Sequence, residues 1–138
     1  MASESTTSSV LAGPPLERIA KPWGEELILD RSLDTVVKML RIEPGRRLSL
    51  QFHRQKHETL MLLSGTAILT LGPSTDRLRH ATLAAGSRVA IEPLTIHRVE
   101  AGSDGADILE VASRPQGDDE DIVRLADDYG RIPRLERS

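Results

Sequence analysis

The sequence contains no cysteine and few aromatic residues, and each absence excludes a class of function. Because none of the 138 residues is cysteine, neither a disulfide framework nor a thiolate metal site can form. Aromatic residues make up 2% of the chain, too few for the stacking platforms that bind single-stranded nucleic acid. Basic residues number 18 against 21 acidic ones, a net charge of -3, whereas a phosphate-backbone binder needs a basic face. We therefore expect no nucleic-acid partner.

Long apolar runs are also absent. No run approaches the roughly 20 residues that span a bilayer, and the opening MASESTTSSVLAGPP lacks the charged start and apolar core of a signal peptide. We expect a cytoplasmic protein with no membrane partner. Residues 1–15 are rich in serine, threonine, glycine and proline, which predicts a disordered tail. Residues 16–138 are long enough for one domain.

Short apolar runs separated by turn residues follow from Trp23 onward. Runs such as EELIL, TVVKMLRI and TAILTL alternate with EPGRR, GPSTD and GSDG. Many short strands with this punctuation predict an all-β barrel or sandwich. One short helix is predicted over residues 121–128, because Ile122, Leu125 and Ala126 recur at helical spacing.

The stretch LSLQFH places polar groups inside apolar sequence. In a strand, Ser49, Gln51 and His53 point to one face and their apolar neighbours to the other. If the polar face is turned inward, each unpartnered group costs roughly 1–3 kcal/mol. A metal ion would satisfy several of these groups at once.

The spacing of further polar residues supports a metal site. Glu58 begins the next predicted strand, and His97 in EPLTIHRVEA is the candidate for a fourth ligand beside Gln51 and His53. Two imidazoles, one carboxylate and one amide oxygen suit one divalent ion: zinc, iron, manganese, nickel or cobalt. A histidine in a strand is more often a structural residue than a ligand, so the prediction depends on the spacing of the whole set.

The same residues resemble the first cupin motif, G-x5-H-x-H-x3,4-E-x6-G. This chain reads Gly45-x5-Gln51-x-His53-x4-Glu58-x6-Gly65, with glutamine in place of the first histidine. The second motif is represented by Gly86 and His97. Other residues stand where cupins usually carry proline, glycine and asparagine, namely Glu92, Leu94 and Ala101. The resemblance implies a single cupin barrel, also called a double-stranded β-helix or jelly roll.

Longer stretches resemble one branch of this family. KPWGEELIL, PGRRLSLQFH, LSGTA, HRVEA and DDEDIVRLADDYGR are similar to the C-terminal cupin domain of type II mannose-6-phosphate isomerases and to small stand-alone cupins related to it. The likeness covers about residues 20–131. It implies a metal-dependent isomerase that interconverts mannose 6-phosphate and fructose 6-phosphate, with Gln51, His53, Glu58 and His97 as metal ligands.

An aldose–ketose isomerase also needs a group that moves a proton and a partner for the substrate phosphate. Lys38 in VVKML and Glu110 in ILEVAS are the candidate proton carriers, and a structural role is the alternative for each. Arginine offers a two-pronged donor to phosphate oxygens. The candidate substrate-binding residues, all at positions similar to those of the family, are Arg47, Ser49, Arg98 and Arg131.

Two other functions fit the same residues. One is a non-catalytic metal-binding cupin that binds or senses a small sugar or sugar phosphate. The other is an iron dioxygenase, because two histidines and a carboxylate leave positions open for oxygen. Gln51 and the isomerase-like flanking sequence count against the dioxygenase.

The sequence also predicts contacts beyond the metal site. Leu48, Leu50 and Phe52 lie opposite the ligand face, and exposed apolar patches are uncommon on monomers, so we expect a homodimer. The segment that contains Tyr129 and Arg131 is expected to close over the mouth of the barrel, bringing Arg131 to the cavity. The alternative is a solvated acidic tail.

Overall fold

The computed structural model describes residues 14–114 and 121–132, and within them the chain is built from strands. The predicted tail of residues 1–15 falls almost wholly outside the described residues. No helix that could cross a membrane occurs in the described part of the chain. The strands are β1 (Glu17–Lys21), β2 (Gly24–Arg31), β3 (Thr35–Ile42), β4 (Leu50–His53), β5 (Glu58–Gly72), β6 (Arg79–Leu83), β7 (Arg88–Ile91), β8 (Ile96–Ser113) and β9 (Ile122–Ala126). The prediction of an all-β fold is confirmed.

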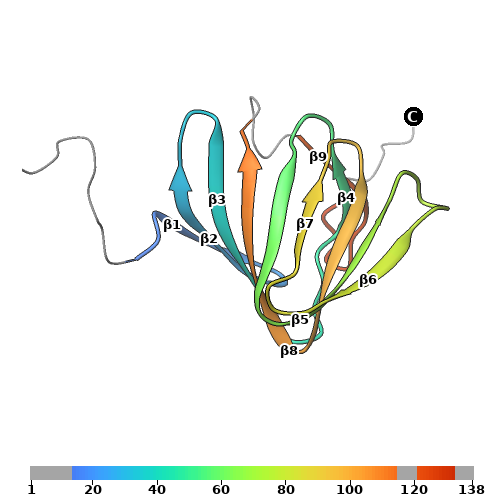
Figure 1. The fold of residues 1–138 in the computed structure, drawn as a ribbon, viewed down its shortest axis with the longest axis horizontal. Helices are drawn as coiled ribbons and strands as arrows, with labels where there is room; N and C mark the ends of the chain where they lie inside the picture. Colours follow the sequence, from blue (N-terminus) through green and yellow to red (C-terminus); the bar gives the residue numbers. More distant parts are fainter. Residues whose placement is uncertain (1–13, 115–120, 133–138) are drawn as a thin grey trace, which may run out of the picture.

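The strands form one sheet that curls on itself, and the two longest strands make the curl (Figure 1). The first part of β5 pairs with the second part of β8, and its second part pairs with the first part of β8. Strands β1, β2 and β3 extend one side of this pair, and β4 and β9 extend the other. Both long strands bend where Gly65 lies against Gly105. Gly65 has a φ of +84°, and a Cβ atom there would collide with the backbone oxygen of Gly105.

Alternation of side chains divides the barrel into an inner and an outer face. The inner face carries a buried core that includes Leu40, Leu60, Leu62, Leu69 and Ile108. Burying side chains of this kind contributes about 1.5–3 kcal/mol each. Because Leu40 of this core also lines a cavity, the core forms the floor beneath the polar groups described below.

The prediction of a helix over residues 121–128 is wrong. Residues Ile122–Ala126 form strand β9, which pairs antiparallel with β4. An unpaired edge of β4 would leave its backbone hydrogen-bonding groups exposed, and the β-branched Ile122 and Val123 favour a strand. The pairing with β4 therefore outweighs the helical spacing of Ile122, Leu125 and Ala126.

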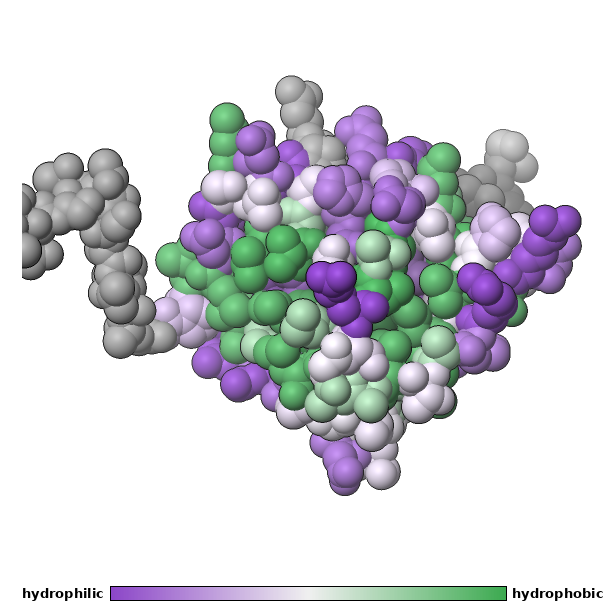
Figure 2. Space-filling view, in the orientation of Figure 1, coloured by the Kyte–Doolittle hydropathy of each residue, from purple (hydrophilic) through white to green (hydrophobic). Residues whose placement is uncertain are grey.

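The sequence predicts that Leu48, Leu50 and Phe52 share an apolar outer face, and the structure differs from this expectation at Leu48. Strand β4 begins only at Leu50, so alternation does not extend to Leu48, which packs against the core and lines the cavity. Leu50 lies on an outer surface groove that also contains charged residues. The outer face of β3, β8 and β5 is more apolar, and Figure 2 shows hydrophobic side chains gathered over these strands.

Candidate metal centre and cavity

Three potential metal ligands converge from three different strands. His53 ends β4, Glu58 begins β5 and His97 lies near the start of β8. All three are buried, and each offers a ligand atom within 4.8 Å of those of the others. Gln51 is the register partner of His97 in the pairing of β4 with β8, so the two side chains lie on the same face of the sheet. The structure therefore brings together the four residues that the sequence indicated.

The hydrogen bonds around these ligands suit a cation. Nδ1 of His97 lies 2.9 Å from the backbone oxygen of Thr95, a contact that requires Nδ1 to carry the proton and leaves Nε2 as an electron-pair donor. Nε2 lies 2.8 Å from Oε1 of Glu58, but without hydrogen-bond geometry. Nδ1 of His53 is buried and has no hydrogen-bond partner among the described residues. Buried donors and acceptors are costly when unpaired, so this donor set fits a divalent metal.

The charges at the centre are set by burial and by contact between the ligands. Burial lowers the pKa of His53 to about 4. Burial opposes ionisation of Glu58, but His97 and the charge of Lys56 lower the pKa of Glu58 to about 2. Burial also disfavours the charged form of His97, yet contact with Glu58 raises its pKa above the ordinary value. At neutral pH the centre thus presents one carboxylate and a neutral His53.

The amide of Gln51 is oriented by its neighbour. The hydroxyl of Ser49 donates a hydrogen bond to Oε1 of Gln51 at 2.6 Å, and Ser49 is almost fully buried. Such contacts from outside the ligand set commonly fix the direction of a ligand. Ser49, a predicted substrate-binding residue, thus contacts a candidate metal ligand directly.

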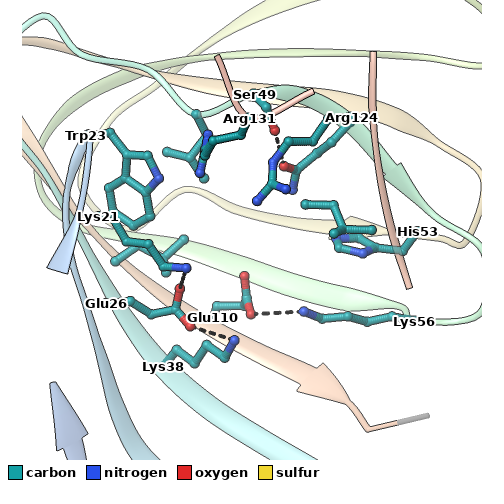
Figure 3. Close-up of a pocket in the computed structure, with 14 residues that line it drawn as sticks. Lys21, Trp23, Glu26, Lys38, Ser49, His53, Lys56, Glu110, Arg124 and Arg131 are labelled. Atoms are coloured by element: carbon teal, nitrogen blue, oxygen red, sulfur yellow. Dashed lines mark hydrogen bonds and ion pairs between the residues drawn. The ribbon is translucent and has the colours of Figure 1, made fainter. Parts of the chain in front are cut away.

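A cavity of about 310 Å³ opens beside His53 (Figure 3). Lys21 and Trp23 lie at one end of the view, and His53 and Lys56 lie at the other. The lining is strongly polar and carries five cations and two carboxylates among its residues: Lys21, Trp23, Glu26, Lys38, Leu40, Leu48, Ser49, Gln51, His53, Lys56, Glu110, Ile122, Arg124 and Arg131. The excess of cations suits an anionic ligand.

The two carboxylates of the cavity are held by lysines. Glu26 lies 2.6 Å from Nζ of Lys38 and 3.7 Å from Nζ of Lys21. Oε2 of Glu110 lies 3.6 Å from Nζ of Lys56. Burial, followed by the charge of Glu58, raises the pKa of Glu110 to about 7. A carboxyl group with such a pKa can both accept and release a proton near neutral pH.

The predicted catalytic and substrate-binding residues occupy different places. Lys38 and Glu110, which are register partners on β3 and β8, both line the cavity. Arg131 also lines it, while its guanidinium contacts both carboxylate oxygens of Asp127. Arg98 donates to the backbone oxygens of Leu48 and Ala126 and lines a smaller pocket behind the cavity. Arg47 lies apart.

Arg47 contacts the C-terminal segment on the outer surface. Its guanidinium donates two hydrogen bonds to Asp128, at 2.7 and 2.9 Å, and it lines the outer groove beside Leu50. Tyr129 donates to the backbone oxygen of Arg47 at 2.8 Å. In this position Arg47 helps to hold the segment that follows β9.

Sequence reasoning assigned no role to several residues of the cavity, among them Trp23, Glu26, Lys56 and Arg124. A signal for Arg124 was present, because strand alternation places it on the face of Ile122, but the helix prediction concealed it. Lys56 lies in the turn between β4 and β5, where no periodicity applies. Its position between two metal ligands was the only available indication.

The loop before His97 brings this histidine to the candidate metal centre despite the departures from the second cupin motif. Leu94 stands where cupins usually carry glycine, and its φ is +69°, a conformation that glycine adopts with the least strain. The amide of Leu94 donates to the backbone oxygen of His53 at 2.7 Å. This bond connects the loop that leads to one histidine with the strand that carries the other.

Comparison with solved structures agrees with the fold. Among solved structures, CapF with bound 3-isopropenyl-tropolone superposes with a TM-score of 0.73 at 17% identity, covering 81% of this chain and 34% of CapF. Oxalate decarboxylase from Bacillus subtilis gives 0.68 at 19% identity, covering 79% of this chain and 30% of that one. These likenesses concern the fold alone, which is a cupin barrel, as predicted.

Sequence comparison places the chain within a narrower group. Residues 15–127 match the model of the mannose-6-phosphate isomerase C-terminal family, and the chain belongs to that family. It is 33% identical over 114 residues to the alginate biosynthesis protein AlgA of Pseudomonas aeruginosa, covering 82% of this chain and 23% of AlgA. It is 30% identical over 115 residues to a mannose-1-phosphate guanylyltransferase of Escherichia coli, covering 83% and 23%. The chain thus spans about a quarter of the length of these relatives.

Proposed function

We propose that this chain is a metal-dependent isomerase that interconverts mannose 6-phosphate and fructose 6-phosphate. One observation carries the proposal: a single cavity is bordered by two of the candidate metal ligands, Gln51 and His53, by Glu110 with its raised pKa, and by an excess of cations. The other two candidate ligands, Glu58 and His97, line a smaller pocket that shares Gln51 and Glu110 with the cavity. A sugar phosphate needs these three features for its reacting oxygens, its transferred proton and its anionic group. The family membership supports the same reaction.

The metal would be held by Gln51, His53, Glu58 and His97. A divalent cation there supplies Lewis-acid stabilisation of the negative charge that develops on substrate oxygens during proton removal. The protein's own part is to keep His53 neutral and Glu58 ionised, as their pKa values of about 4 and about 2 allow at neutral pH. The donor set fits zinc, manganese, iron, nickel or cobalt.

Glu110 is the proposed proton carrier. Its Oε2 removes the proton from one substrate carbon and returns it to the neighbouring carbon. The ammonium of Lys56, 3.6 Å away, stabilises the ionised form of Glu110 before the proton is removed and after it is returned. Lys38 is the other candidate, and its contact with Glu26 at 2.6 Å fixes its position in the cavity wall.

The cations away from the metal ligands are proposed to bind the phosphate. Lys21 and Arg131 lie near Trp23 in Figure 3, at the end of the cavity opposite Lys56. Arg124 reaches the cavity from β9. Arginine and lysine pair with phosphate oxygens through charge-assisted hydrogen bonds. The phosphate would thus lie at one end of the cavity and the reacting carbons beside Glu110.

A second candidate is a binding module that holds a sugar phosphate without turnover. It is favoured by the ion pairs of Lys38 and Glu110, because both candidate proton carriers already hold a partner in the cavity wall. The cavity and the metal centre would then serve recognition alone. We further propose, from the sequence, that the protein is a cytoplasmic homodimer.

Incubation of metal-loaded protein with fructose 6-phosphate in deuterated water separates these functions. Formation of mannose 6-phosphate is the result expected for an isomerase, and deuterium at its second carbon reports proton exchange with solvent. No product, together with a metal-dependent thermal shift on adding the sugar phosphate, would identify a binding module. The absence of both signals would contradict both functions. The His97→Ala variant is the matched control, because it should lose either signal.

A further inference from the structure

Asp121 connects the start of β9 to the turn between β4 and β5. Its carboxylate accepts hydrogen bonds from three consecutive backbone amides: Arg54 at 3.1 Å, Gln55 at 3.1 and 3.2 Å, and Lys56 at 2.9 Å. Its own backbone oxygen accepts a fourth contact, from the amide of Arg54 at 3.4 Å. Asp121 is 9% exposed. These bonds join segments more than 60 residues apart in the sequence.

The turn that Asp121 holds lies between two candidate metal ligands. It begins directly after His53 and ends directly before Glu58. Lys56, within the turn, is buried and extends its ammonium to Glu110. The next residue after Asp121, Ile122, is the register partner of His53. A movement of this turn would therefore displace a metal ligand and the partner of the proposed proton carrier together.

A carboxylate suits this place better than a neutral group. Backbone amides that point at one site carry partial positive charge, and hydrogen bonds to an ionised acceptor are stronger than those to a neutral one. Burial would raise the pKa of Asp121, but the amides of Lys56, Gln55 and Arg54 lower it. The group is thus ionised at neutral pH, and no other described side chain takes hydrogen bonds from these three amides.

We propose that Asp121 is a positioning residue, which holds residues 54–56 of this turn and thereby fixes His53 in the metal centre and Lys56 against Glu110. The proposal rests on the proposed function, because it assumes that the centre binds a metal. It adds a residue that contacts neither the metal nor the substrate.

Two measurements on the full chain test this role. The first is the affinity for Co²⁺, followed by its visible absorption well below the unfolding temperature. Asp121→Ala should bind Co²⁺ about 10- to 100-fold more weakly than the unchanged protein. This range is typical of mutations that remove a residue orienting a metal ligand. Asp121→Asn, which keeps one acceptor oxygen, should lose less. The second measurement is hydrogen exchange of the Arg54, Gln55 and Lys56 amides without metal, which should become faster in Asp121→Ala.

Ser113→Ala is the matched control. The Ser113 hydroxyl accepts a hydrogen bond from the amide of His57 at 3.1 Å, so it supports the same turn from the side away from the cavity. This variant should keep both the Co²⁺ affinity and the protection of the three amides, even if its unfolding temperature falls. Equal Co²⁺ affinity in all variants would overturn the positioning role. Unchanged amide exchange in Asp121→Ala would do so as well.

The second measurement also separates this proposal from the proposed function. If the unchanged protein binds no Co²⁺, the proposed function fails, and so does the part of the proposal that concerns the metal. Faster amide exchange in Asp121→Ala would then still support the conclusion that Asp121 fixes the conformation of the turn. If Asp121→Ala does not fold, Asp121→Asn carries both measurements at low temperature.

Discussion

The ammonium of Lys56 lies 3.6 Å from Oε2 of Glu110, and this contact joins the turn between two candidate metal ligands to the wall of the cavity. Lys56 comes from the turn after β4, whereas Glu110 lies near the end of β8. Burial raises the pKa of Glu110 to about 7, and the ammonium limits that rise. The pair therefore holds a carboxyl group of raised pKa beside the candidate metal centre.

Replacement of Glu110 by glutamine should abolish most isomerase activity. The variant keeps the shape of the side chain but cannot carry a proton, so we expect the turnover rate to fall by about 10²- to 10⁴-fold. Metal content should stay the same, because Glu110 is not among the proposed ligands. Glu100→Gln, which changes an exposed carboxylate on the outer groove, should remain active. Full activity of Glu110→Gln in a coupled assay would exclude Glu110 as the proton carrier.

Removal of an imidazole from the metal centre should remove the metal. We expect one divalent ion per chain in the purified protein and a substoichiometric amount in His53→Ala and in His97→Ala, measured by elemental analysis. His80→Ala is the control, since His80 is exposed and contacts Thr70 on the outer surface. Unchanged metal content in both His53→Ala and His97→Ala would contradict the assignment of the ligands.

The candidate metal ligands could be predicted from the sequence because their spacing follows strand geometry. Gln51 and His53 lie two residues apart on one strand, and side chains at that interval share a face. Glu58 follows after one turn, and the register of β4 with β8 places His97 opposite Gln51. Short-range periodicity and one motif were sufficient for this part of the site.

The rest of the cavity depends on contacts that periodicity does not encode. Arg124 enters the cavity because β9 pairs with β4, and the sequence alone indicated a helix there. Lys56 comes from a turn, where side-chain direction depends on the bonds that Asp121 accepts. Arg47 has the residue type expected at a phosphate site, but its contact with Asp128 draws it to the outer surface.

Replacement of Leu94 by glycine should stabilise the protein. Leu94 has a φ of +69° and is 61% exposed, so glycine would relieve roughly 1–2 kcal/mol of backbone strain and lose little buried surface. Glycine also gives the unfolded chain more conformational freedom, which lowers the free energy of unfolding by roughly 0.5–1 kcal/mol. We expect the free energy of unfolding to rise by up to about 1 kcal/mol, measured by urea denaturation.

Leu33 provides the matched control for this prediction. It is 88% exposed, and among the described residues other than glycine only Leu94 has a positive φ. Leu33→Gly should therefore lower the free energy of unfolding by roughly 0.5–1 kcal/mol, the entropic cost alone. A decrease of equal size in both variants would show that Leu94 is not strained.

The proposed homodimer should form through the outer face of β3, β8 and β5. The inner face of these strands carries Lys38, Glu110 and Leu60 in one register row, so the residues between them point outward. In the register rows on either side of Lys38, the outward residues include five apolar ones: Val37, Met39, Met61, Leu109 and Val111. A contiguous apolar surface is typical of an interface.

Two substitutions distinguish this face from the one around Leu50. Val111 is 40% exposed and Ile68, on the outer groove, is 43% exposed. Val111→Glu should convert the dimer to a monomer in light scattering at micromolar concentration, because a buried unpaired charge is costly. Ile68→Glu should leave the dimer intact. The opposite pattern would place the interface at the groove, and a monomeric unchanged protein would exclude the dimer.

The stability that Asp121 contributes should depend on pH in a defined direction. Its pKa in the folded protein lies below the ordinary value of 3.8, so its contribution is present above that value and is lost as the pH falls through the folded-state pKa. At pH 5–7, Asp121→Asn should unfold with a free energy about 1–3 kcal/mol smaller than that of the unchanged protein. Below pH 3.8 this difference should shrink, because the carboxyl group becomes protonated. Urea denaturation of both proteins in a chelator measures the difference without metal, and a constant difference down to pH 3 would contradict an ionised Asp121 at the turn.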